Sequence, residues 1–358
     1  MSENTAAGTS AGAASSASLP PTNRDLVPED GEKKPAGSRL TGSGVARNLG
    51  LVVALVLLLA VGAATAGADF LSFDNIVVIL SQAATIGIVA VGMTFVITGG
   101  GIDLSVGSVM GLATVWASTL ATQAMAENSH WIVMVFTAVA VGAAAGLING
   151  IIVSYGKVVS FIATFAMLVG ARGLAEIISN RRTQLVEVQP FLETFRADWL
   201  GVPMIVWIFA VVAIAGWVLL NRTTFGRRTI AVGGNPEAAR LAGIKVKRHM
   251  MYLFAISGTT AGIAAVTMLA RTRSGSSTTG MLYELDAIAA VVVGGTLLIG
   301  GRGTIIGTVF GVLIFATLNS LFIQNNLSTS VQSVSKGVII VLAVLLQQRL
   351  ANRGSGSS

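Results

Sequence analysis

The stretch that decides the fold is IVVILSQAATIGIVAVGMTFVIT, residues 76–98, which is followed at once by GGGIDLSVGS, residues 99–108. The first part carries no charged side chain. It is longer than the stretch of about 20 residues that a helix needs to cross a bilayer. The second part interrupts the apolar run with three glycines and an acid. The sequence therefore predicts a membrane-spanning helix that ends in a glycine-rich break.

Similar apolar runs recur along the chain. Hydrophobic residues make up 53% of the 358 residues and charged residues only 11%, whereas soluble domains carry about 25% charged residues. We therefore predict an all-α polytopic membrane protein. Its apolar runs predict about ten transmembrane helices, at residues 49–67, 76–98, 105–125, 131–153, 159–179, 204–220, 250–270, 285–299, 304–323 and 331–348.

Both ends of the chain differ from the middle. Residues 1–44 are rich in Ser, Ala, Gly, Thr and Pro, and such a segment buries too little apolar surface to order itself. We expect a disordered cytoplasmic tail there and a second disordered tail at residues 350–358. Residues 45–349 are expected to form one transmembrane domain.

The basic residues set the predicted orientation. With the N-terminus inside, the loops place sixteen of the 23 Lys and Arg residues on the inner side and five on the outer side. This bias predicts an N-in, C-in topology. It also explains the net charge of +7 without nucleic acid as a partner.

Cysteine and histidine usage limits the chemistry. The chain has no cysteine and two histidines, His130 and His249, which both fall in predicted loops. Disulfides and thiolate sites are excluded, and a histidine metal site or catalytic triad is disfavoured. We expect no metal site and no catalytic residue.

The predicted inner loop, residues 221–249, contains a helix signal. Asn235 is a good cap, Pro236 suits the first turn, Glu237 suits the positive helix end and Gly243 can end the helix. A short cytoplasmic helix of this kind is either a docking element or an ordinary basic connection. The docking interpretation assigns coupling to Phe225, Gly226, Arg227, Gly233, Gly234, Asn235, Pro236, Glu237, Ala238, Ala239 and Gly243.

The glycine-rich break places polar groups near the hydrocarbon. Asp103 and Ser105 are candidates for a polar translocation path. Alternatively, Asp103 is the N-cap of the helix that follows and Ser105 lies in its first turn, and the two interpretations are compatible. A second break at residues 293–304 again joins glycines to a predicted span. Paired interruptions of this kind are typical of repeated transporter halves.

Other polar residues fall within predicted spans. For Asn149 and Asn319 we expect either hydrogen bonds between helices or contacts with a transported ligand. Arg172 and Glu176 have the i, i+4 spacing of an ion pair. The predicted outer loop at 180–203 is expected to hold a short interfacial helix.

Several short motifs together resemble the permease subunits of ribose-type sugar ABC importers of bacteria. The resemblance runs from about residue 50 to 348 and rests on the combination rather than on one motif. The motifs are GIDLSVGS (101–108), GLING (146–150), FIAT (161–164) with RGLA (172–175), TFGR (224–227), GGN (233–235) with AA (238–239), YELDAIAA (283–290) and GGRG (300–303).

This resemblance implies a type II ABC importer-like fold in a bacterial inner membrane. It implies a second permease copy, two ATP-binding cassette subunits and an extracytoplasmic sugar-binding protein as partners. The chain itself would be no enzyme and would hold no cofactor, because ATP is bound by the partner subunits. The implied cargo is a monosaccharide such as ribose or a xylose-like pentose.

Two other functions stay open at this point. A branched-chain amino acid-type ABC permease is the nearest alternative. An ion-coupled secondary carrier would need an ion site with intramembrane carboxylates, and Glu176 is the only clear acid in the middle of a predicted span. Dependence of transport on ATP and partner subunits separates the importer from the carrier.

Overall fold

The computed structural model describes residues 39–339 and residue 341. Contacts divide the chain into the units 1–42 and 43–358. In the first unit, the described residues 39–42 form the first turn of a helix. The predicted tail at 350–358 and most of the tail predicted at 1–44 lie outside the described residues.

Long apolar helices dominate the second unit, as predicted. Seven helices in the described part are long and apolar enough to cross a bilayer. The chain is therefore a helical multi-span membrane protein. These helices are α1 (Arg39–Ala66, with its apolar span at Asn48–Ala66), α2 (Phe73–Thr98), α5 (Ile132–Ser154), α6 (Ser160–Ser179), α8 (Met204–Arg222), α11 (Val246–Thr272) and α13 (Ile305–Gln324).

Seven is fewer than the ten predicted. The run at 105–125 is broken into α3 (Val106–Ala117) and α4 (Leu120–Asn128), because Thr119 caps the second helix by accepting a hydrogen bond from the Thr122 N–H. The run at 285–299 forms only the short α12 (Tyr283–Val293), which ends at Gly294. Residues 329–339 are helical, and the rest of the run at 331–348 is outside the described residues apart from residue 341.

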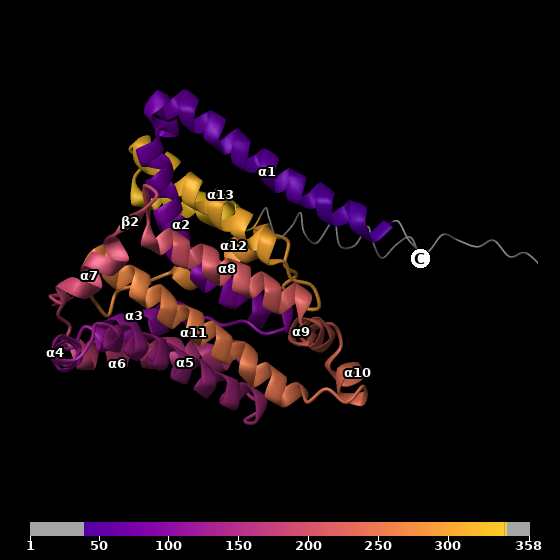
Figure 1. Cartoon of the computed structure of the whole chain (residues 1–358). Helices are drawn as coiled ribbons and strands as arrows, with labels where there is room; N and C mark the ends of the chain where they lie inside the picture. Colours follow the sequence, from indigo (N-terminus) through magenta and orange to yellow (C-terminus); the bar gives the residue numbers. More distant parts are fainter. Residues whose placement is uncertain (1–38, 340, 342–358) are drawn as a thin grey trace, which may run out of the picture. The chain divides into compact units, whose positions relative to one another are not determined.

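Short elements lie at the two ends of the long helices. In Figure 1, α4 and α7 (Gln189–Arg196) lie at the left, and α9 (Thr224–Gly234) and α10 (Pro236–Leu241) lie at the right. The helix α7 confirms that the loop 180–203 contains a short helix. The remaining elements are η1 (Ala68–Leu71) and two antiparallel pairs, β1 (Gln184–Leu185) with β4 (Ser274–Gly275) and β2 (Asp198–Trp199) with β3 (Val202–Pro203).

Glycines allow α5 and α11 to pack with their backbones in contact. Gly142 and Gly146 on α5 face Gly258 and Gly262 on α11 at four-residue spacing. A Cβ atom at Gly146 would lie 2.9 Å from the Cα of Gly258 and closer still to the carbonyl oxygen of Phe254. Helices that gain little from the hydrophobic effect in lipid associate through such small residues.

Replacing Gly146 by alanine is expected to lower the stability of the folded chain. The added methyl group has no space at the α5–α11 contact, and overpacking of this kind costs about 1–3 kcal/mol. The measurement is the unfolding temperature in detergent. Gly173→Ala on α6 is the matched control, since nothing lies within 4 Å of its added Cβ. Equal unfolding temperatures for the two variants would contradict the tight packing.

Candidate functional site: a loop helix, two glycine breaks and a buried polar cluster

The helix α10 forms as the sequence predicts. The Asn235 side-chain oxygen accepts a hydrogen bond from the Ala238 N–H at 2.9 Å, and Pro236 occupies the first turn. Gly243 follows the helix with a φ of +83°, a conformation that glycine adopts without strain. The local signals therefore specify both ends of this six-residue helix.

Most of α10 is available for contact with a partner. Only Ala239 is buried, whereas Leu241 is 83% exposed. Glu237 and Arg240 form an ion pair at 2.8 Å, which is exposed and contributes little to stability. The sequence places Leu241 at the end of this helix but does not show that its side chain is exposed.

The preceding helix α9 is held firmly against the long helices. The Phe225 ring lies 6.3 Å from the Phe95 ring and 4.6 Å from the His249 ring, centroid to centroid. The buried Thr229 hydroxyl is hydrogen-bonded to the Nε2 atom of His249 at 2.9 Å. Because of these contacts, α9 would move together with the start of α11.

The two glycine-rich breaks meet at the end of α9. The Gly301 N–H donates to the Thr98 carbonyl oxygen at 2.9 Å, which joins the segment after α12 to the end of α2. Gly233 on α9 packs on both partners, since a Cβ atom there would lie 2.6 Å from the Gly301 nitrogen. Gly300 packs against the backbone of Gly100. The structure therefore brings together both breaks and the predicted coupling residue Gly233.

Asp103 is the centre of a buried polar cluster. Its Oδ1 atom accepts hydrogen bonds from the Ser105 N–H at 3.0 Å and the Ser105 hydroxyl at 2.6 Å. Its Oδ2 atom accepts a hydrogen bond from the Ser257 hydroxyl at 2.8 Å. The Asn149 side-chain amide donates to the Ser105 hydroxyl oxygen at 2.8 Å. All four side chains are buried, so the cluster ties the break to α5 and α11.

The cluster changes two of the sequence interpretations. The N-cap position of α3 is occupied by Ser105 rather than by Asp103. The Ser105 side chain accepts no hydrogen bond from the backbone of the helix. Asp103 instead folds the turn before the helix and reaches across to Ser257, which sequence reasoning did not select. Asn149 forms the interhelical hydrogen bond predicted for it.

Asn319 lies elsewhere, although it was predicted to share a path with Asp103. It lines a cavity of about 490 Å³ together with Asp286 and Lys336, whose side chains form an ion pair at 3.2 Å. Among the described residues no hydrogen bond joins Asn319 to the Asp103 cluster. The predicted path residues thus fall into two groups.

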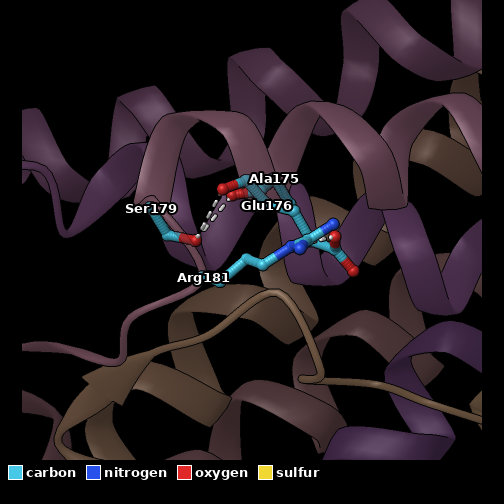
Figure 2. A network of polar contacts seen from close by, with 4 residues as sticks. All are labelled: Ala175, Glu176, Ser179 and Arg181. Carbon is cyan, nitrogen blue, oxygen red and sulfur yellow. Dashed lines mark hydrogen bonds and ion pairs between the residues drawn. The ribbon is translucent and has the colours of Figure 1, made fainter.

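The predicted ion pair between Arg172 and Glu176 is wrong. Glu176 pairs with Arg181 at 3.0 Å, and Figure 2 shows this contact beside the hydrogen bond from the Ser179 hydroxyl to the Ala175 carbonyl oxygen. Arg172 donates instead to the carbonyl oxygens of Ser277 and Thr279. The guanidinium therefore holds the segment between β4 and α12 against α6.

Replacing Arg172 by glutamine is expected to loosen the segment at residues 276–282. Hydrogen bonds from charged groups contribute about 1.5–3 kcal/mol, and the shorter side chain cannot reach both carbonyls. Limited proteolysis of the detergent-purified chain would show faster cleavage in this segment. Arg181→Gln is the control, because its exposed ion pair with Glu176 contributes at most about 1 kcal/mol. Equal cleavage rates for both variants would contradict this role of Arg172.

The bundle of apolar helices, interrupted by two glycine breaks, is typical of a membrane transport protein. Residues 75–345 match the family described as branched-chain amino acid transport system / permease component. The chain belongs to this family of transport permeases.

Several relatives of the chain are named as permeases for sugars. The chain is 40% identical to the ribose import permease protein RbsC of Escherichia coli (strain K12) over 302 residues, which are 83% of this chain and 92% of the relative. It is 39% identical to RbsC of Bacillus subtilis (strain 168), covering 87% of this chain and 96% of the relative. It is 38% identical to the L-arabinose transport system permease protein AraH of Escherichia coli (strain K12), covering 78% of this chain and 84% of the relative. No solved structure matches the chain.

Proposed function

We propose that the chain is the membrane-spanning permease subunit of an ATP-driven ABC importer in a bacterial inner membrane. Its cargo is a monosaccharide, ribose or a related pentose, delivered by an external binding protein. The observation that carries this proposal is the 40% identity to a ribose import permease over 92% of its length. The arabinose relative supports a pentose and disfavours a branched-chain amino acid.

The contacts of α9 support a route for the driving force. ATPase subunits bind α10 and push on α9, which is fixed to α11 through His249 and Thr229. Gly233 transmits the movement to Thr98 and Gly301, at the ends of the two breaks. Displacing the breaks opens the polar path to the cytoplasm. In this assignment the chain hydrolyses no ATP, and two copies of it form the pathway.

An N-in, C-in topology with ten crossings remains compatible with only seven long helices. The break before α3 lies beside Gly233 of α9, whereas Ser118, just after α3, hydrogen-bonds Gln184 in the 180–203 loop at 2.9 Å. The short α3 and the break together therefore reach from one loop layer to the other. In the same way, α12 and the segment at 294–304 together reach from one loop layer to the other. Within this segment, Gly301 contacts Thr98 at the end of α2. The tenth predicted crossing, at 331–348, lies partly outside the described residues, of which 329–339 are helical.

Reconstitution of the intact complex tests this function. The tagged chain is purified from its own cells with bound ATPase subunits, inserted into liposomes and supplied with the external binding protein. We expect uptake of labelled ribose or another pentose that requires ATP and the binding protein. Omitting either component, or using a non-hydrolysable ATP analogue, is the control.

Two results would overturn the proposal. Sugar uptake by the chain alone, without nucleotide, would identify an ion-coupled carrier instead. ATP-driven uptake of leucine in place of a pentose would identify an amino acid importer.

A further inference from the structure

A basic cavity lies between α9 and the start of α11. Its volume is about 350 Å³, within the range of about 300–1,000 Å³ typical of ligand pockets. Its lining includes the cations Arg228, Lys245 and Arg248 and the aromatic rings of Phe225 and Tyr252. None of the residues that line it is acidic. We call this cavity the basic pocket.

The positive charge extends beyond the basic pocket. A neighbouring cavity of about 530 Å³ shares Lys245 and Arg248 and adds Lys247 and Arg240 to its lining. Among the described residues, Arg240 has an ion-pair partner, whereas the three cations of the basic pocket have none. Several cations without a partner repel one another, so an anion bound among them would be stabilised.

Arginine–aromatic contacts near the basic pocket are of the kind that occurs at the depth of lipid headgroups. The Arg248 guanidinium lies 5.5 Å from the centre of the Tyr252 ring and donates to its hydroxyl at 2.7 Å. At the loop-side end of α8, Arg222 lies 5.1 Å from the centre of the Trp217 ring. Trp and Tyr are enriched where spanning helices pass the headgroups, and α8 and α11 are both spans. The pocket opens beside the first turns of α11, at this level.

We propose that the basic pocket binds the phosphate-bearing headgroup of an anionic phospholipid. Arg228, Lys245 and Arg248 supply charge-assisted hydrogen bonds to the phosphate oxygens. Basic pockets beside spanning helices are suited to such headgroups. The bound lipid would stabilise the contact between α9 and α11, because the pocket residues come from both helices and from the loop that joins them. This inference does not depend on which solute is transported.

Native mass spectrometry of the full-length chain tests the pocket. The chain is purified in detergent and mixed with equal amounts of phosphatidylglycerol and phosphatidylcholine. We expect retained phosphatidylglycerol, and at least a tenfold loss of it in the triple variant Arg228→Gln, Lys245→Gln, Arg248→Gln. The matched control is Arg181→Gln, Arg182→Gln, Arg196→Gln, which removes three exposed arginines from the 180–203 loop. The double variant Arg228→Lys, Arg248→Lys should keep most of the lipid, because the charge is retained.

Three kinds of result would overturn the proposal. The first is equal retention of the two lipids, or equal loss in the triple variant and its control. The second is release of the lipid by millimolar inorganic phosphate, which would make free phosphate the ligand. The third is a triple variant that keeps the lipid but no longer binds ATPase subunits, which would assign the cations to a protein partner.

Discussion

The Leu241→Glu variant is expected to lose ATP-driven uptake almost completely while the chain stays folded. Leu241 is 83% exposed, so its replacement removes little from the core of the chain. In the proposed complex the side chain is buried in a groove of the ATPase subunit, where a carboxylate without a partner is costly. A loss of about 2 kcal/mol, typical of a central interface residue, weakens docking about 30-fold. Co-purification of ATPase subunits and uptake in liposomes measure the effect.

Leu200→Glu is the matched control for this prediction. Leu200 is 76% exposed and lies in the 180–203 loop, away from α9 and α10. The control variant should co-purify with ATPase subunits as well as the unchanged chain does. If Leu241→Glu also kept full ATPase binding and uptake, α10 would not be the docking element.

The long helices could be predicted because their signal is local. Each needs only an apolar run of sufficient length, and residues 76–98 show such a run without reference to the rest of the chain. The ends of α10 are equally local, since Asn235, Pro236 and Gly243 each favour one conformation wherever they occur. Length and capping residues therefore sufficed for most of the helical fold.

The short helices α3, α4 and α12 could not be predicted from apolarity. The segment at 105–125 carries no charged residue, and the turn within it is marked by one threonine cap, Thr119. The helix in the segment at 285–299 ends at Gly294, where the backbone of Gly307 on α13 leaves no space for a side chain. Such a contact depends on a residue that is distant in the sequence.

In the candidate site, too, single residues could be predicted from the sequence, whereas their contacts could not. The sequence indicates Asp103, Ser105 and Asn149 as polar residues in apolar surroundings, but it does not show that Ser257 completes the cluster. It shows two glycine breaks without showing that they meet at Gly233. The identity of a residue can thus mark a functional position, whereas its partners follow from the packing of the helices.

Replacing Asp103 by leucine is expected to destabilise the chain and reduce uptake to below about a tenth. Three donors, from the backbone and hydroxyl of Ser105 and the hydroxyl of Ser257, would lose their acceptor in a buried place. Each buried donor without a partner costs about 1–3 kcal/mol, so the total cost is at least about 3 kcal/mol. The break would also lose its hydrogen bond to Ser257 on α11. The unfolding temperature in detergent and uptake in liposomes are the two measurements.

Comparison with Asp103→Asn separates the structural role of Asp103 from a role in the path. Asparagine keeps the shape and can still accept from Ser105, while its amide group can donate to the Ser257 hydroxyl oxygen. If the cluster only fixes the break, this variant should recover most of the stability and most of the uptake. Recovered stability without recovered uptake would mean that the carboxylate itself acts in translocation. An Asp103→Leu variant as stable as the unchanged chain would contradict the proposed cluster, because three buried donors cannot lose their acceptor without cost.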